Sequence, residues 1–297
     1  MEELKSVRAE NYLQQFNLMY FKHKNDTTKL IITSPKCGTR YLSGTAESNA
    51  GFSRFHPAEL TKAEIDNYFS NVSEIYWIIR PPMEHLISAI MTEHQSNMNS
   101  VENPNKTSSK LKIKKNDEEW KLTILETLLK DILTEPKFTI NTNNNGSSMF
   151  GHYTPKYNTI YNDIPYKIEF FSKIKFVELK NLSQLLESEF NIYFNIEDKN
   201  YAMNQYFTKS SILAAMELNF ADMWGELKKI IDTEQYYYTS ILNYDYEVLF
   251  TTKINEAHKE LDSVYDKLKK LIPSYSSYRV KNIKNNITNI KKQLKIN

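Results

Sequence analysis

The segment Ser34–Arg40 combines residue types that suit an anion, because a lysine, a glycine and a threonine follow one another between an apolar run and a helix-compatible stretch. Glycine lets the backbone turn closely around a bound group, and the first N–H groups of a helix are unpaired donors at the positive end of its dipole. Gly38, Gly44 and Gly51 are three of the chain's six glycines. We therefore expect this segment to bind a phosphate or a sulfate.

Two familiar nucleotide motifs do not fit the same segment. A Walker A loop needs a second glycine directly before its lysine, whereas here Lys36 precedes Gly38. The G-x-G-x-x-G pattern of dinucleotide-binding proteins is missing as well. ATP hydrolysis and hydride transfer are therefore disfavoured.

A second group of candidate residues follows the apolar run Ile75–Ile79. Arg80 ends that run, and Ser88 comes eight residues later in a predicted helix. An arginine at a strand end and a hydroxyl in the following helix are both side chains that can donate hydrogen bonds. Each also has a plain structural interpretation, since Arg80 could form an ion pair at a strand end and Ser88 could bond to its own helix backbone.

Taken together, the two segments resemble PAPS-dependent sulfotransferases, where PAPS is 3′-phosphoadenosine 5′-phosphosulfate. That family has a P-K-x-G-T-[TRS] loop after its first strand, and it holds the nucleotide 3′-phosphate with an arginine and a serine spaced like Arg80 and Ser88. The family usually has Arg-Asp-Pro where this chain has Arg80-Pro81-Pro82, which leaves the cap of the following helix open. Residues Leu30–Ala89 carry most of the resemblance.

A third segment is similar to carbohydrate sulfotransferases in particular. Gly151–Tyr157 and the later run 175–186 (KFVELKNLSQLL) resemble the H-[WY]-x-x-Q region and the "E-N-L" strand and helix of those enzymes. Lys156 stands in place of the glutamine, and Lys180 intrudes before Asn181-Leu182. The resemblance implies transfer of a sulfuryl group to a sugar hydroxyl, with lipid, peptide tyrosine or phenol acceptors left open.

The resemblance also implies a set of site residues. PAPS, or its product 3′-phosphoadenosine 5′-phosphate (PAP), would be bound by Pro35, Lys36, Cys37, Gly38, Thr39, Arg40, Arg80 and Ser88. Lys36 would stabilise charge on the departing phosphate oxygen, and no metal would be required.

The acceptor side of the site has several candidates. His56, at the end of a short predicted strand, is the first candidate for the base, with Glu59 as the alternative, because related glycan sulfotransferases carry a histidine or glutamate in this region and imidazole has a suitable pKa. His85 and His152 are candidates for acceptor contact. A structural role is the competing interpretation for His56 and His85.

The elements that must position these residues follow from hydrophobic patterning. Apolar runs predict strands at Lys29–Ser34, Phe52–Phe55, Ile75–Ile79 and Lys175–Leu179. Helices are expected over 39–49, 61–70, 82–95, 118–133, 182–190 and much of the chain beyond Ser210, with polar loops at 97–117 and 141–148. Alternation of this kind predicts an α/β fold, a P-loop-like three-layer sandwich around a mostly parallel sheet.

We expect two units in the chain. Residues 1–272 would form the sulfotransferase-like domain. Residues 273–297 would form a basic amphipathic helix or tail, with an apolar stripe that includes Ile283 and Ile287. This tail is interpreted as a solvated or partner-pairing helix in preference to a surface for anionic ligands.

Composition sets the remaining expectations. With 38 basic and 36 acidic side chains among 297 residues, the chain is too balanced for a dedicated nucleic-acid binder. One cysteine rules out an internal disulfide, and the lack of a long apolar segment or a secretory pattern predicts a cytoplasmic protein. The wealth of Lys, Asn, Ile and Tyr suggests a viral or AT-rich microbial genome, and oligomeric state stays open.

Two other functions remain possible on these residues. A P-loop nucleotide kinase or phosphotransferase shares the strand, loop and helix arrangement and would prefer ATP with magnesium. A non-catalytic glycan- or partner-binding protein on a degenerate sulfotransferase fold would use Lys110–Lys115 and the basic tail instead.

Overall fold

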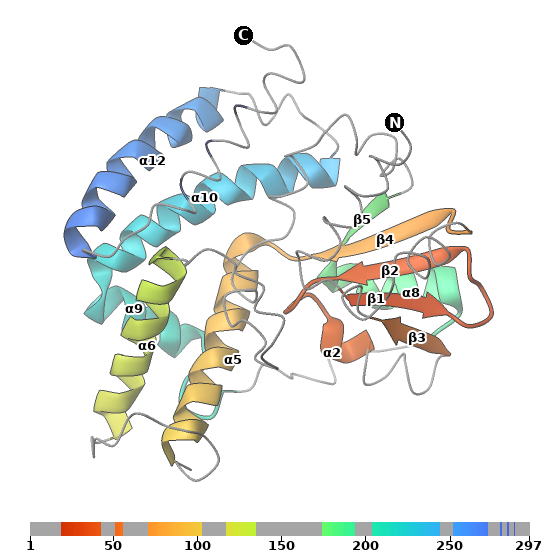
Figure 1. Ribbon diagram of the computed structural model, residues 1–297, viewed down its shortest axis with the longest axis horizontal. Coiled ribbons are helices and arrows are strands. Elements are labelled where there is room, and N and C mark those ends of the chain that lie inside the picture. The colour runs from red at the N-terminus through yellow and green to blue at the C-terminus, as the bar shows by residue number, and fades with distance from the viewer. Residues whose placement is uncertain are drawn as a thin grey trace, which may run out of the picture.

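The computed structural model describes residues 19–42, 51–55, 71–102, 117–134, 174–193, 204–243 and 252–272, together with residues 280, 284 and 288. These residues form an α/β arrangement in which a five-stranded sheet lies beside a group of helices (Figure 1). The strands are β1 (Met19–His23), β2 (Lys29–Thr33), β3 (Phe52–Phe55), β4 (Glu74–Ile79) and β5 (Ile174–Glu178). The helices are α2 (Thr39–Tyr41), α5 (Pro82–Glu102), α6 (Asp117–Thr134), η6 (Leu179–Asn181), α8 (Leu182–Phe190), α9 (Lys209–Asn219), α10 (Ala221–Asn243) and α12 (Thr252–Leu271).

The sheet is mixed, with strand order β3-β1-β2-β4-β5. β2, β4 and β5 run parallel, as the prediction of a parallel sheet requires. The sheet was predicted to be mostly parallel and is mixed, because β1 pairs antiparallel with both β2 and β3. The sequence prediction omitted β1, which separates β3 from β2 and moves β3 to the edge.

The inner parallel strands β2 and β4 are apolar on both faces, which explains why their runs were recognisable. Side chains alternate between the two faces of a strand, so Trp77 of β4 joins one core cluster while Tyr76 and Ile78 join the other. Register is regular along the pairs, with Ile31 opposite Tyr76 and Trp77 opposite Phe176. β4 is therefore an inner strand of the sheet, between β2 and β5, and is buried on both faces.

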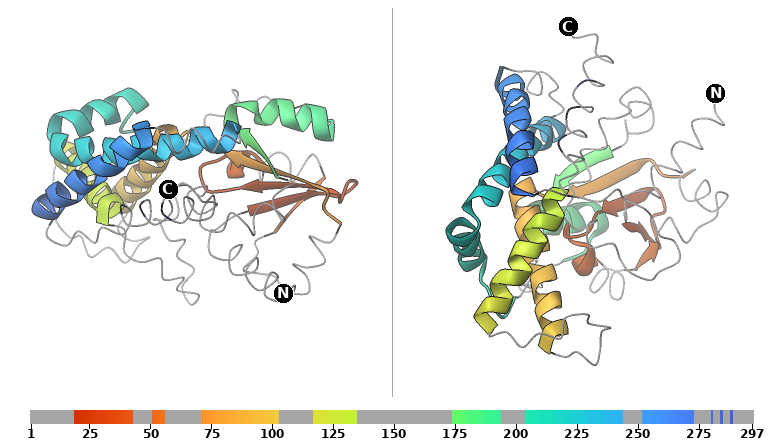
Figure 2. Two further views of the ribbon diagram at one scale, coloured as in Figure 1. Left: turned by 90° about the horizontal axis from the view of Figure 1, so that it is seen from above. Right: turned by 60° about the vertical axis from the view of Figure 1, so that its left-hand side comes forward.

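Two hydrophobic cores flank the sheet. The smaller one lies against α8, whose Leu182, Leu185, Leu186 and Phe190 pack on one face of the sheet. The larger one joins the other face to side chains of α5, α6, α9, α10 and α12. Figure 2 shows α8 on one side of the sheet and the longer helices extending beyond it.

The end of α5 differs from the prediction. α5 continues to Glu102, although we expected it to end near Gln95 and a loop to begin at 97. The buried Met98 holds this extra turn against the larger core. The helical predictions for 118–133, 182–190 and the stretch beyond Ser210 are confirmed where the chain is described, whereas 43–49, 61–70 and 141–148 lie outside the described residues.

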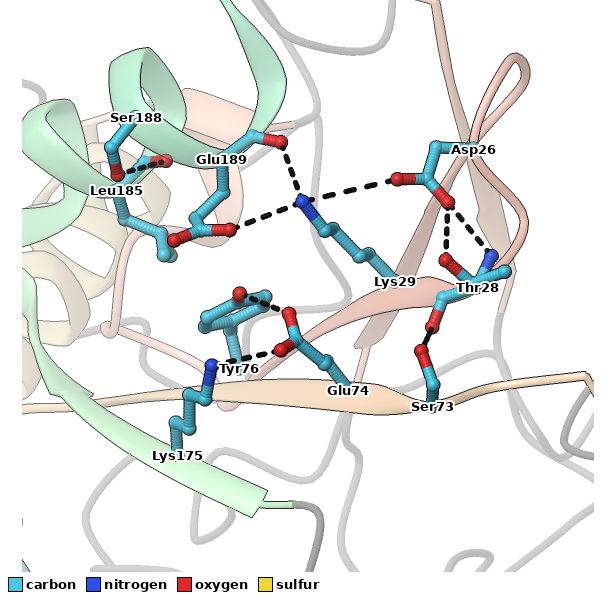
Figure 3. A network of polar contacts seen from close by, with 10 residues as sticks. All are labelled: Asp26, Thr28, Lys29, Ser73, Glu74, Tyr76, Lys175, Leu185, Ser188 and Glu189. Atoms are coloured by element: carbon cyan, nitrogen blue, oxygen red, sulfur yellow. Dashed lines mark hydrogen bonds and ion pairs between the residues drawn. The ribbon is translucent and has the colours of Figure 1, made fainter.

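Polar contacts fasten α8 to the amino-terminal ends of the strands (Figure 3). Lys29 Nζ lies 3.1 Å from both the backbone carbonyl and the carboxylate of Glu189, and 3.9 Å from Asp26. The Tyr76 hydroxyl donates to Glu74 at 2.6 Å, and Lys175 Nζ reaches the same carboxylate at 2.9 Å. These contacts lower the pKa of Glu189, first through its hydrogen bond with Lys29, and the pKa of Glu74, first through its hydrogen bond with Tyr76.

Residues of the predicted tail contact the rest of the protein at the points that are described. Val280 is buried in the larger core, and Lys284 forms an ion pair with Asp262 of α12. The division of the chain at residue 272 stays a prediction. Within the described ranges, none of the helices combines the length and the apolar character that crossing a bilayer would need.

Candidate functional site at the carboxyl edge of the sheet

The three parallel strands end at the same edge of the sheet, where ligands of open α/β sheets bind. β2 is followed by the segment Ser34–Gly38, β4 by Arg80, and β5 by the short helix η6. In Figure 1 this edge faces the start of α5. The two segments that carry the family resemblance therefore meet here, on adjacent strands.

Hydrogen bonds close the segment after β2 into a tight turn, which we call the anion loop (Ser34–Gly38). The Cys37 N–H donates to the Ser34 carbonyl at 3.0 Å, and the Thr39 hydroxyl donates to the same carbonyl at 3.0 Å. The Thr33 and Thr39 hydroxyl oxygens are 2.7 Å apart. The Thr39 hydroxyl therefore stabilises the loop through the Ser34 carbonyl and the Thr33 hydroxyl. Its contact with a bound nucleotide stays a prediction.

Backbone conformation sets the course of the anion loop. Lys36 has φ 65° and Gly38 has φ 87°, so both residues lie in the left-handed region. Such a conformation is uncommon for lysine and is found most often at turns and functional sites. α2 begins after Gly38 without a capping side chain, so its first N–H groups have no partner from a cap.

The anion loop packs directly on the chain that follows β5. A Cβ atom added to Gly38 would lie 2.8 Å from Leu179 Cδ1 of η6 and 3.1 Å from Leu182 Cδ2 of α8. Glycine is thus required at this position for two reasons, its φ angle and the close approach of the two leucines. The fit fixes the position of η6 relative to the loop.

Arg80 joins the anion loop to α5. Its Nη1 donates to the Lys36 carbonyl at 3.3 Å, and its Nε lies 3.5 Å from the Glu84 carboxylate. The Arg80 side chain is 23% exposed, and its Nε atom is buried. Both halves of the predicted nucleotide site are thus in contact.

His85 and Ser88 lie one turn apart on α5, and both are buried. His85 Nε2 is 2.9 Å from the Pro35 carbonyl, an arrangement that favours support of the anion loop over contact with an acceptor. Ser88 shares the face of α5 that carries His85, because residues three apart on a helix are neighbours. Its carbonyl accepts a hydrogen bond from Thr92 at 2.9 Å.

A third set of residues at this edge was not predicted as part of the site. Glu178 ends β5, and its carboxylate pairs with Lys180 Nζ at 2.6 Å, which raises the pKa of Lys180. Tyr238, on α10, is buried nearby, and its pKa is raised by burial and then by the neighbouring carboxylates of Glu178 and Glu84. Only the "E-N-L" similarity pointed to η6, and no sequence signal pointed to Tyr238.

Several predicted residues lie outside the described part of the chain. They are His56, Glu59 and His152, as well as the side chain of Arg40, and their proposed roles stay predictions. Cys37 is 3% exposed, in keeping with a small packing residue. Among the residues that the structure describes, no three histidine, cysteine, aspartate or glutamate side chains are grouped so as to hold a metal ion.

No protein-family model, no curated protein and no solved structure matches this chain. The chemistry of the site is therefore inferred from its residues and their geometry.

Proposed function

We propose that the protein is a PAPS-dependent sulfotransferase that transfers a sulfuryl group to a hydroxyl acceptor, with a carbohydrate as the favoured acceptor. The observation that carries the proposal is the contact between Arg80 Nη1 and the Lys36 carbonyl, 3.3 Å apart. The two segments to which the family resemblance points lie side by side on adjacent parallel strands. One nucleotide with anionic groups at both ends could span such an arrangement.

The proposal divides the nucleotide between two groups of residues. The anion loop, with Lys36 and the N–H groups of residues 38–40, would hold the 5′-phosphosulfate. Arg80 would hold the 3′-phosphate with Ser88. A guanidinium carries five donors, so the bond from Arg80 to the Lys36 carbonyl leaves others for a phosphate.

In the proposed reaction the acceptor oxygen attacks sulfur in line, the bond from sulfur to the 5′-phosphate oxygen breaks, and PAP departs. His56 or Glu59 would take the acceptor proton. The Lys36 ammonium would stabilise the negative charge that gathers on the departing oxygen. The P-loop-like three-layer form of the fold is part of this proposal, and α8 and the longer helices on opposite faces of the sheet support it.

Ligand-dependent unfolding tests the choice of nucleotide. PAP at 100 times its dissociation constant should stabilise the protein by about 2.7 kcal/mol, whereas ATP and NAD should have little effect. Preferential stabilisation by ATP with magnesium would select the kinase alternative. Stabilisation by PAP without turnover of PAPS on any sugar acceptor would select the non-catalytic alternative.

Replacement of Lys36 tests the role of the anion loop. Lys36→Ala should abolish turnover, and Lys36→Asn should do the same while tolerating the left-handed backbone. Lys24→Ala is the matched control, because it removes one exposed lysine from the turn between β1 and β2 at the opposite end of β2. Turnover near wild type in both Lys36 variants would remove this residue from the mechanism.

A further inference from the structure

Lys180 lies beside the anion loop, because the residue before it, Leu179, packs against that loop. A Cβ at Gly38 would come within 2.8 Å of Leu179, so η6 lies directly against the loop. Lys180 is the middle residue of η6, and its side chain is 74% exposed. The backbone of η6 is thus anchored by the apolar contacts of Leu179 and Leu182, while the Lys180 ammonium can reorient.

Charged side chains at this edge of the sheet form two neighbouring ion pairs. Arg80 Nε lies 3.5 Å from Glu84, and Lys180 Nζ lies 2.6 Å from Glu178. Glu178 is in register with Ile79, the residue that precedes Arg80, so the two pairs follow the ends of neighbouring strands. Glu84 also acts electrostatically on Lys180, which joins both pairs in one cluster.

We propose that Lys180 is a second cationic contact for the phosphate that Arg80 binds, so that the anion is held between β4 and η6. This inference rests on the proposed function. In the structure Glu84 forms an ion pair with Arg80, and Glu178 forms one with Lys180. A phosphate monoester carries close to two negative charges at neutral pH, and a guanidinium together with an ammonium would match that charge.

The exchange of partners is energetically reasonable. Ion pairs at the surface contribute little to stability, and Lys180 is 74% exposed, so water solvates its ammonium, although Glu178 is only 18% exposed. Lys180 therefore loses little when it leaves Glu178 for a phosphate. The ammonium acts as a point charge with three rotatable donors, so it needs no fixed geometry to complete the site.

Lys175 offers a matched control for this inference. It lies on β5 like Glu178, its side chain is 55% exposed, and it pairs with Glu74 at 2.9 Å, but it belongs to the opposite end of the strand. Lys180→Gln and Lys175→Gln therefore change the net charge equally, and only the first should change a contact with the ligand. Isothermal titration with PAP and with adenosine 5′-monophosphate isolates the 3′-phosphate, by which the two nucleotides differ.

Lys180→Gln should weaken PAP binding about tenfold, a typical loss for a hydrogen bond to a charged group, and should leave the binding of adenosine 5′-monophosphate nearly unchanged. Lys175→Gln should behave as wild type with both nucleotides. Equal PAP affinities in the two variants would overturn the role of Lys180. A parallel loss of affinity for both nucleotides in Lys180→Gln would overturn it as well.

Failure of the proposed function gives a different result. If the wild-type protein does not bind PAP, the sulfotransferase proposal fails, and inorganic phosphate becomes the probe for Lys180. Phosphate binding about tenfold weaker in Lys180→Gln than in Lys175→Gln would then support the second contact. Equal phosphate affinities, or no phosphate binding by the wild-type protein, would refute it.

Discussion

Substitution of Gly38 by alanine tests the packing of the anion loop against η6. With φ 87°, an alanine would be held in the left-handed region, at a cost of about 1–2 kcal/mol. Its Cβ would also lie 2.8 Å from Leu179 Cδ1, the far end of a side chain that can shift, so overpacking should cost about 1 kcal/mol, the low end of its usual range. The smaller backbone entropy of alanine in the unfolded chain offsets about 0.4–1 kcal/mol. We expect a net loss of about 1–3 kcal/mol in the free energy of unfolding.

Thermal unfolding measures this loss, since 1 kcal/mol shifts the midpoint of a domain of this size by about 2 °C. Gly38→Ala should therefore unfold roughly 2–6 °C below wild type. Gly225→Ala is the control, because Gly225 lies inside α10 and an added Cβ would meet nothing within 4 Å. That variant should be as stable as wild type or more stable, by up to about 1 kcal/mol. If Gly38→Ala and Gly225→Ala have the same midpoint of thermal unfolding, the anion loop is not held against η6 as described.

Three further substitutions probe other contacts. Burial lowers the pKa of His94 below 6.5, so the unfolded chain binds a proton at this residue before the folded protein does as the pH falls. The difference in unfolding free energy between wild type and His94→Asn, measured with urea, should therefore shrink from pH 7.5 to 5.5. A constant difference would contradict this. Lys29→Met removes the ammonium that joins β2 to the end of α8, and should cost about 1–2 kcal/mol in the same assay, against no loss for Lys24→Met. Glu84→Gln frees Arg80 from its carboxylate and should tighten PAP binding roughly two- to fivefold by calorimetry; weaker binding would show that Glu84 positions Arg80 instead.

The two inner strands that carry the site, β2 and β4, were predictable because their side chains are buried on both faces. Ile75–Ile79 is continuously apolar, and β4 covers these residues together with Glu74. β1 was missed since its five residues include a lysine and a histidine and no β-branched residue. It is nevertheless buried at Tyr20 and Phe21, because β2 and β3 flank it on both sides.

The parts of the site that depend on tertiary packing could not be predicted in the same way. The resemblance to sulfotransferases implied a second phosphate site at Arg80 and Ser88, but only the pairing of β2 with β4 brings Arg80 to the Lys36 carbonyl. Tyr238 comes from a helix far along the chain and reaches the edge of the sheet through the packing of α10 near β5. Neither contact leaves a periodic signal in the sequence.

The distance along the chain between neighbouring strands has a consequence for the order of folding. β1 and β2 are joined by five residues, 24–28, whereas β5 begins at Ile174 and pairs with β4, which ends at Ile79. Closing the longer connection costs more chain entropy, and pairings between distant segments form slowly. During refolding, amide protons of β1 and β2 should thus gain protection from exchange before those of β5, and pulse labelling that finds β5 protected first would exclude this order. The side of the site that η6 provides would then be completed last.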